Sequence, residues 1–306
     1  MHVMGGGDVG GAKTQIMNTV TGLSRTNDVM LISFRAGPFA DEARERGIDV
    51  RVIERHNPFR AARTMRDLVD EFKPDIIHCH GGRANLMGAM VRRSRRIPII
   101  TTVHSDYRLD YLGSPLKQHT LGTANAIALR FLDFYQPVAD RMARTLIERG
   151  FDPERIVKIY NGMEFNRPEG EFDRAAYLRE TYGAEIEEGD VLCGIAARLT
   201  AVKDIATTVR GFAEALKTAP QLRLFIAGDG EDADMLKKLC DQLGVRERVT
   251  FCGWVSPVMP FFRAMDINLL SSVSETFPYS ILEGVCAGCA TICSDVGGMP
   301  ELIDTG

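Results

Sequence analysis

Residues 191–230 read VLCGIAARLTAVKDIATTVRGFAEALKTAPQLRLFIAGDG, and this stretch contains one complete unit of the fold. Two short apolar runs, 191–196 and 222–227, enclose a segment, 205–216, whose apolar residues recur with the period of a helix. A strand, a helix and a second strand in this order predict two parallel strands joined by a crossover helix. The stretch therefore predicts a parallel sheet with helices packed against it.

The same alternation continues on both sides of this stretch. Ahead of it, we expect strands at 29–34, 49–53, 75–78 and 98–103, and helices at 13–24, 60–72 and 83–93. Beyond it, we expect strands at 249–251, 267–270 and 291–294, and helices at 231–243, 257–264 and 279–287. This pattern predicts an α/β fold that binds its ligands at the carboxyl ends of the strands.

The length of the chain favours two domains, because 306 residues exceed what one ordinary hydrophobic core supports. Residues 161–190 are rich in Gly, Glu, Asp and Pro and show weak periodicity. We therefore predict a Rossmann-like N-terminal domain at 1–166, a linker at 167–189 and a Rossmann-like C-terminal domain at 190–306. The active site is expected in a cleft between the two domains.

The composition excludes several classes of protein. Hydrophobic residues make up 45% and charged residues 25% of the chain, as in ordinary globular proteins. No apolar run approaches the length of a membrane span, and the N-terminus lacks the features of an export signal, so we expect a cytoplasmic protein. Seven cysteines without regular spacing suit a reducing compartment. The net charge of −4 argues against a nucleic-acid partner.

The charge is unevenly distributed. Residues 1–166 carry 24 Lys and Arg against 19 Asp and Glu, a net charge of +5, whereas residues 167–306 carry a net charge of −9. The segment 83–96 reads as a helix that is apolar on one side and carries Arg92, Arg93, Arg95 and Arg96 at its end. Two interpretations stay open: a solvated helix end, or a patch that binds anionic lipid at the inner face of the membrane.

The N-terminal glycines, GGGDVGG at residues 5–11, allow four interpretations. Gly5, Gly7 and Gly10 have the spacing of a dinucleotide fingerprint, and Arg35 is placed to meet a 2′-phosphate, which would indicate an NADP oxidoreductase. A P-loop is nearly matched, but Ala12 stands where glycine is needed. A simple tight turn and the glycine loop of a sugar transferase satisfy the same backbone chemistry.

The sequence contains two clusters of potential metal ligands. Cys286, Cys289 and Cys293 lack a matching second pair, so they do not predict a zinc site, and we expect no metal. His78 and His80 lie at a strand end and point the same way, as alternate residues of a strand do. Contact with a ligand and ordinary packing both remain open for this pair.

Residues 271–283, SSVSETFPYSILE, carry the most specific chemistry. The stretch leads from a strand into a helix, with Glu275 ahead of the helix and Glu283 about two turns inside it. The two carboxylates can accept hydrogen bonds from sugar hydroxyls, and the free N–H groups of the first helical turn can donate to a diphosphate. A solvated glutamate beside a helix-face glutamate is the alternative.

This stretch resembles the E-x7-E motif of retaining glycosyltransferases of family 4, which have the GT-B fold. Other segments resemble further motifs of that family, in the same order along nearly the whole chain. They are the glycine loop at 10–12 (GGA), 102–105 (TVHS), 160–162 (YNG), 197–199 (ARL) with Lys203, 226–230 (IAGDG), 251–253 (FCG) and 287–301. Each segment is weak by itself, but their ordered combination is highly specific.

The resemblance implies a role for each matching residue. Arg198 and Lys203 would hold the donor diphosphate, Glu275 and His104 would contact the donor sugar, and Glu283 would bind the ribose. Further donor-binding residues would be Phe277, Tyr279, Ser280, Gly228 and Gly253, with Gly10 and Gly11 in the glycine loop. The acceptor hydroxyl would attack on the face of the leaving group, and the donor phosphate would help to take its proton. No separate base, metal or cofactor is then expected.

The resemblance leaves the partners open and has three departures. The nucleotide-sugar donor is a co-substrate, and the acceptor would be a glycan, a lipid-linked molecule or a small molecule. Ala197 replaces a glycine, Glu164 replaces an aspartate, and the family continues beyond Gly306, so we expect the second domain to be incomplete. A nucleotide-sugar epimerase, a non-catalytic scaffold and an NADP oxidoreductase are the alternative functions.

Overall fold

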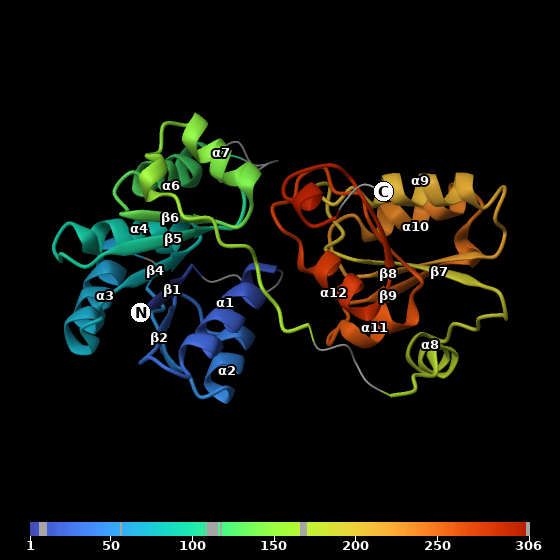
Figure 1. The fold of residues 1–306 in the computed structure, drawn as a ribbon, viewed down its shortest axis with the longest axis horizontal. Helices are drawn as coiled ribbons and strands as arrows, with labels where there is room; N and C mark the ends of the chain where they lie inside the picture. Colours follow the sequence, from blue (N-terminus) through green and yellow to red (C-terminus); the bar gives the residue numbers. More distant parts are fainter. Residues whose placement is uncertain are drawn as a thin grey trace. The chain divides into compact units, whose positions relative to one another are not determined.

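The computed structural model describes residues 1–5, 11–55, 57–106, 108, 116, 118–165 and 170–303. The chain divides into two compact units, Met1–Met163 and Glu164–Gly306. Each unit is a parallel sheet with helices on both faces (Figure 1). The α/β fold that the sequence predicts is therefore confirmed. Among the described residues, no helix is long and apolar enough to cross a bilayer.

The sheet of the first unit has the order β3-β2-β1-β4-β5-β6, and its described pairs are all parallel. The strands are β1 (His2–Met4), β2 (Met30–Ser33), β3 (Asp49–Val52), β4 (Ile77–His80), β5 (Ile99–Val103) and β6 (Phe134–Pro137). The helices are α1 (Gly11–Leu23), α2 (Pro38–Glu45), α3 (Pro58–Phe72), α4 (Gly82–Arg92), α6 (Thr123–Leu129) and α7 (Asp140–Glu148), with short turns at Gln118–Gly122 and Pro153–Arg155.

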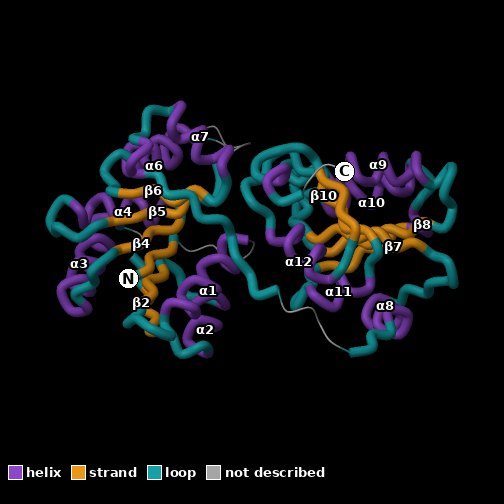
Figure 2. The backbone as a smooth tube through the Cα atoms, viewed as in Figure 1, coloured by secondary structure: helices purple, strands orange, loops and turns teal. Residues whose placement is uncertain are grey.

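Alternation along each strand divides the core of the first unit into two layers. Val3 and Cys79 pack with residues of α3 and α4 on one face of the sheet. Met4 and Leu31 pack with residues of α1 and α2 on the other face. Figure 2 shows helices on both sides of these strands. The histidines of β1 and β4 alternate with Val3 and Cys79, so they belong to the face that α1 covers.

The sheet of the second unit has the order β11-β10-β7-β8-β9, again with parallel pairs. Its strands are β7 (Val191–Ala196), β8 (Leu222–Ala227), β9 (Val249–Gly253), β10 (Ile267–Leu270) and β11 (Ala290–Cys293). Its helices are α8 (Arg174–Tyr182), α9 (Ile205–Ala215), α10 (Ala233–Gln242), α11 (Met259–Ala264) and α12 (Tyr279–Ala287), with short 3-10 turns at Arg246–Arg248 and Met299–Glu301. Residues of α9 and α10 pack in one core layer, and residues of α8 and α11 pack in another.

The structure adds elements that the sequence pattern did not predict: β6, α2, α6, α7 and α8. Helix α8 lies within residues 167–189, which were expected to be a linker. Its N-terminus is capped by Asp173, whose side chain accepts a hydrogen bond from the Ala176 N–H, and Gly183 ends it in a left-handed conformation. Leu178 is fully buried in the core of the second unit. One buried residue in nine leaves too weak a period to predict this helix.

Strand order creates one topological switch point in each sheet. In the first unit the order reverses between β1 and β4, and in the second unit it reverses between β7 and β10. The chain leaves two neighbouring strands in opposite directions at such a point, which opens a crevice at their carboxyl ends. Ligand-binding residues are therefore expected on the loops that follow β1 and β4 in the first unit, and β7 and β10 in the second.

Candidate functional site

Lys203 and Glu275 form an ion pair at the switch point of the second unit. Lys203 lies on the loop after β7, and Glu275 lies on the loop after β10, 72 residues further along the chain. Their side chains are only 19% and 10% exposed, and the Ser272 hydroxyl donates a 2.8 Å hydrogen bond to Oε1 of Glu275. The residues expected to meet the donor phosphate and the donor sugar are therefore direct neighbours.

Glycines hold the loop that carries Arg198 against the loop after β8. A Cβ on Gly228 would lie 1.8 Å from the carbonyl oxygen of Ala197, and one on Gly230 would lie 2.2 Å from that of Leu199. The Leu199 N–H donates to the carbonyl of Asp229 at 2.9 Å, and the Gly228 N–H donates to that of Gly253 at 2.7 Å. These contacts join the carboxyl ends of β7, β8 and β9.

Arg198 itself is exposed and forms no ion pair or hydrogen bond through its side chain with any described residue. Its guanidinium can offer two parallel N–H groups to a phosphate, whereas the Lys203 ammonium is already paired with Glu275. An anion that entered here would meet one cation without a protein partner and one shared cation.

The segment from Glu275 to α12 is fixed by close backbone contacts. A Cβ on Gly297, which has a φ of +60°, would lie 1.6 Å from the carbonyl oxygen of Glu275. The Gly298 N–H donates to the carbonyl of Thr276 at 2.8 Å. Phe277 and Tyr279 are buried, and the Ser280 carbonyl accepts a hydrogen bond from the Asn268 side chain at 2.9 Å.

Glu283 lies one helical turn inside α12, not two as the sequence suggested. The helix begins at Tyr279 because Pro278 holds an extended backbone at the N-cap. Burial raises the pKa of the Glu283 carboxyl to about 7. This side chain is therefore a mixture of acid and carboxylate near neutral pH, and the carboxylate accepts hydrogen bonds from a pair of ribose hydroxyls more strongly than the acid form does.

Four histidines gather near the switch point of the first unit. Nδ1 of His2 lies 3.2 Å from Nε2 of His80, and Nδ1 of His80 lies 3.3 Å from Nε2 of His104. Nε2 of His78 lies 2.7 Å from the hydroxyl oxygen of Thr102, and the rings of His78 and His80 stack with centroids 4.4 Å apart. The structure therefore places His78 and His80 on one face of β4, as strand alternation predicts.

Burial keeps these histidines uncharged. It lowers the pKa of His78 and of His104 to about 4, and it lowers the pKa values of His2 and His80 well below their usual range, with a smaller contribution from neighbouring histidines. His2, His78 and His80 place ligand atoms within 4.8 Å of one another, an arrangement that can hold a metal ion. The sequence analysis did not single out His2. A histidine on the first strand, together with the His-x-His pair on a later strand, was the pattern that could have indicated it.

Other predicted residues are placed as follows. Gly10 lies outside the described residues, and Gly11 begins α1. Gly253 is exposed at the end of β9 with a φ of +65°. Cys286 and Cys289 are buried, Cys293 is half-buried, and none belongs to a metal-binding group among the described residues. The exposed cation and the carboxylates of the second unit thus offer a place for an anionic, hydroxyl-rich ligand.

Two family models match the chain. One, described as Glycosyltransferase Family 4, matches residues 9–167, and the other, described as Glycosyl transferases group 1, matches residues 183–306. An uncharacterized glycosyltransferase of Methanocaldococcus jannaschii is 29% identical over 76% of this chain and 60% of its own length. Alpha-monoglucosyldiacylglycerol synthase of Streptococcus pneumoniae is 26% identical over 78% of this chain and 56% of its own length. The chain thus spans less than two thirds of these relatives.

Solved structures with the same fold cover the whole chain. The Anabaena protein HepE in complex with UDP-glucose superposes with a TM-score of 0.84 at 20% identity, over 100% of this chain and 83% of its own. A glycosyltransferase from Rickettsia africae superposes with a TM-score of 0.81 at 18% identity, over 99% and 82%. The two parallel-sheet domains are those of the GT-B fold.

Proposed function

The chain belongs to glycosyltransferase family 4, and on that premise we propose that it moves a sugar, with retention of the anomeric configuration, from a nucleotide-diphosphate sugar to an acceptor hydroxyl. The observation that carries the proposal is the placement of Arg198, Lys203 and Glu275 at the switch point of the second unit. Family membership favours transfer over the epimerase, scaffold and NADP oxidoreductase alternatives.

The second unit would bind the donor. Arg198 and Lys203 would hold the diphosphate, and the ionised form of Glu283 would accept hydrogen bonds from the ribose. Glu275 would face the sugar, where Ser272 and Lys203 fix its orientation. UDP, which is bound in the Anabaena structures, is the first nucleotide to test.

The reaction would need little acid–base chemistry from the protein. The bond between the sugar C1 and the diphosphate oxygen breaks, and a bond from C1 to the acceptor oxygen forms on the same face. The acceptor proton passes to a phosphate oxygen of the leaving diphosphate. Arg198 and Lys203 would stabilise the charge that develops on that leaving group. We propose that this reaction proceeds without a metal or cofactor, since two side-chain cations supply the positive charge.

The first unit would contribute His104 to the donor sugar and bind the acceptor, as the resemblance implies. The names of the relatives include a glycolipid synthase and a D-inositol 3-phosphate glycosyltransferase. They suggest lipid and small polyol acceptors as the classes to screen. A retained configuration would be read directly from the anomeric proton of the product by NMR.

Calorimetric titration of UDP tests the donor site. Arg198→Ala and Lys203→Ala should each weaken binding by about 1.5–3 kcal/mol, which is the range for hydrogen bonds to charged groups. Lys217→Ala is the matched control, because Lys217 is exposed and its one ion-pair partner among the described residues is Glu214, which lies three positions earlier. Unchanged affinity in both test variants would remove Arg198 and Lys203 from the site. Glu275→Gln should weaken UDP-glucose more than UDP if Glu275 faces the sugar.

A further inference from the structure

His2, His80 and His104 form a row of three rings. At each of the two junctions between neighbouring rings, a nitrogen of one ring lies within hydrogen-bond distance of a nitrogen of the next. The two junctions are His2 Nδ1 to His80 Nε2 at 3.2 Å and His80 Nδ1 to His104 Nε2 at 3.3 Å. A neutral imidazole has one N–H and one acceptor nitrogen. Because His80 uses both of its nitrogens, it must donate at one junction and accept at the other.

This constraint leaves the row two arrangements. In the first, His104 donates from Nε2 to His80, and His80 donates from Nε2 to His2, which leaves Nδ1 of His104 as an acceptor. In the second, His2 donates to His80 and His80 donates to His104, which leaves Nδ1 of His104 with the proton. Nδ1 of His104 has no partner among the described residues, so its state is what a ligand would meet.

We propose that His80 and His2 are positioning residues that set which nitrogen of His104 carries the proton, and so whether His104 offers a donor or an acceptor to its ligand. The inference that His80 and His2 determine the protonated nitrogen of His104 depends only on the two nitrogen–nitrogen contacts. Its importance for sugar transfer rests on the proposed function.

The surroundings hold the row in place. His2 and His80 are 5% and 3% exposed, and their ring planes differ by only 14°. The ring of His78 stacks on His80 and is itself held by Thr102 at 2.7 Å. The backbones are fixed by sheet pairing, with Met4 opposite His80 and His80 opposite Thr102. Neighbouring strands leave these rings few alternative orientations.

Binding of a metal ion by His2, His78 and His80 is the competing explanation. Nitrogen ligands of tetrahedral zinc lie about 3.3 Å apart, so the distance from His2 to His80 fits both explanations. The group contains three rings and no carboxylate, and three histidines with a water molecule can hold zinc. A nitrogen that binds a metal cannot also hydrogen-bond to the next ring, so the two explanations exclude each other. Burial that lowers the pKa values of these rings keeps the row neutral, as two alternating hydrogen bonds require.

Proton-detected nitrogen NMR of the full chain with ¹⁵N-labelled histidine tests this inference. We expect His104 to be neutral, with its proton mainly on one nitrogen. His2→Phe keeps a ring in place but removes the far end of the row, and it should change the ratio of the two protonated forms of His104. His80→Asn should change that ratio as well. His119→Ala, which alters an exposed histidine outside the row, should leave it unchanged.

An unchanged ratio in both His2→Phe and His80→Asn, with folded amide spectra, would overturn the inference. So would one equivalent of Zn²⁺ that binds to the wild type and not to His80→Asn. In a transfer assay, His80→Ala should lower kcat by roughly 10- to 100-fold with little change in the donor KM, and His80→Asn should restore part of it. If the NMR result holds but no donor supports transfer, the proposed function fails and the control of His104 stands.

Discussion

At the scale of single residues, Glu283 links stability to ligand binding. Its folded-state pKa of about 7 lies above the usual value of 4.5 for a glutamate. The folded state therefore binds the proton more tightly than the unfolded chain does. Its contribution to the free energy of unfolding is fully present below pH 4.5 and is lost as the pH rises through 7.

We predict opposite responses of stability and UDP affinity to pH in the wild type. Between pH 5 and pH 8 the free energy of unfolding should fall by at most about 3 kcal/mol from this group. UDP affinity should rise by roughly tenfold between pH 6 and pH 8, because the carboxylate form increases. Glu283→Gln should remove both trends relative to the wild type, and urea unfolding with calorimetry would measure them. Glu214→Gln, an exposed change, is the control. Parallel trends in the wild type and Glu283→Gln would contradict this role.

Gly297 has no Cβ, and this lets the backbone of Glu275 pack directly against it. We predict that Gly297→Ala lowers the free energy of unfolding by more than about 1 kcal/mol and also weakens UDP-sugar binding. The added Cβ would lie 1.6 Å from the carbonyl oxygen of Glu275, and the φ of +60° disfavours alanine. Gly211→Ala is the matched control, because nothing lies within 4 Å of its Cβ and it occupies a helix interior. Gly211→Ala should stabilise slightly; similar behaviour of both variants would argue against the close contact at Gly297.

At the scale of elements, α8 distinguishes a structural helix from a linker. We predict that Leu178→Ala lowers the free energy of unfolding of the chain by about 2–5 kcal/mol, because the side chain is fully buried in the second core. Arg179→Ala, at the next and exposed position, should change it by less than about 0.5 kcal/mol. Denaturant titration would compare the two. Equal, small effects would mean that α8 does not belong to the second core.

Whether the sequence predicted a helix or strand depended on the hydrophobic pattern within that segment. The expected bounds of β7, β8, β10 and α12 agree with the structure because each is a short apolar run or a strongly periodic stretch. β6 reads Phe-Tyr-Gln-Pro and lacks such a run, so the sequence pattern does not predict it. Hydrophobic period is a local property and reports only the elements that are buried along most of one side.

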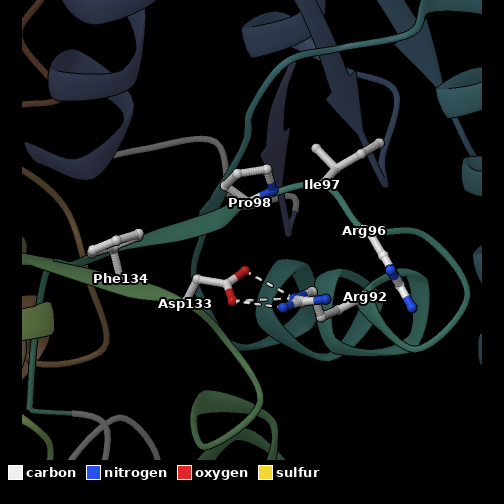
Figure 3. Close-up of a pocket in the computed structure, with 6 residues that line it drawn as sticks. All are labelled: Arg92, Arg96, Ile97, Pro98, Asp133 and Phe134. Carbon is white, nitrogen blue, oxygen red and sulfur yellow. Dashed lines mark hydrogen bonds and ion pairs between the residues drawn. The ribbon is translucent and has the colours of Figure 1, made fainter.

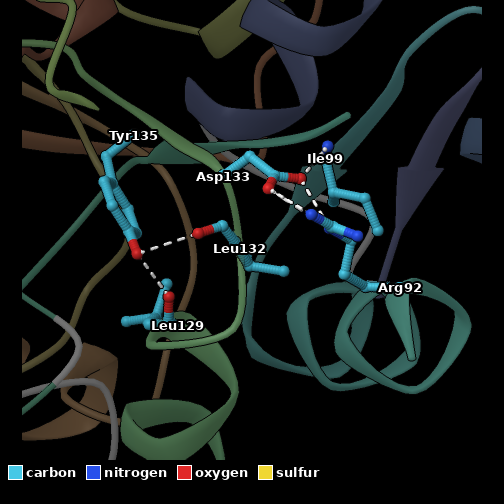
Figure 4. A network of polar contacts seen from close by, with 6 residues as sticks. All are labelled: Arg92, Ile99, Leu129, Leu132, Asp133 and Tyr135. Atoms are coloured by element: carbon cyan, nitrogen blue, oxygen red, sulfur yellow. Dashed lines mark hydrogen bonds and ion pairs between the residues drawn. The ribbon is translucent and has the colours of Figure 1, made fainter. Parts of the chain in front are cut away.

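At the scale of the whole molecule, the four arginines at the end of α4 fall into two groups, those with an ion-pair partner and those without one among the described residues. Arg92 forms a bidentate pair with Asp133, which also accepts from the Ile99 N–H (Figure 4), and Arg95 pairs with Asp70. Arg93 and Arg96 are exposed and have no ion-pair partner among the described residues. Arg92 with Arg95, and Arg93 with Arg96, carry the same total charge. Only Arg93 and Arg96 are without an ion-pair partner among the described residues.

This run of arginines borders a cavity, and an exposed aromatic residue lies close in sequence to the cavity lining. Arg96 and Phe134 line a cavity of about 320 Å³ (Figure 3), and Phe131, nearby in sequence, is 62% exposed. The cavity lies at the amino ends of β5 and β6. His80 and His104 lie at the carboxyl ends of β4 and β5, on the opposite side of the sheet's strand ends. We therefore propose peripheral contact with anionic lipid through Arg93, Arg96 and Phe131, at a surface separate from the histidine row.

We predict that anionic vesicles co-sediment the chain at low salt and release it at high salt. Arg93→Gln with Arg96→Gln should weaken binding by about 2 kcal/mol, since each cation near an anionic surface contributes about 1 kcal/mol. Arg92→Gln with Arg95→Gln removes the same charge from paired residues and should weaken it less. Equal losses would indicate charge attraction without a defined patch. A wild type that stays in the supernatant at low salt would end the membrane proposal.

Strand and helix periods were enough to predict two parallel α/β sheets, and the resemblance of short motifs to glycosyltransferase family 4 was enough to single out Arg198, Lys203, Glu275 and Glu283. Periods and short motifs are both local properties of the chain. The pairing of Lys203 with Glu275 joins residues 72 positions apart, and the junctions of His2 with His80 and of His80 with His104 join residues 78 and 24 positions apart. Those neighbours depend on strand order, β7 beside β10 and β1 beside β4, because order decides which loops meet at a sheet edge. Strand order leaves no period in the sequence, so only the folded chain reveals it.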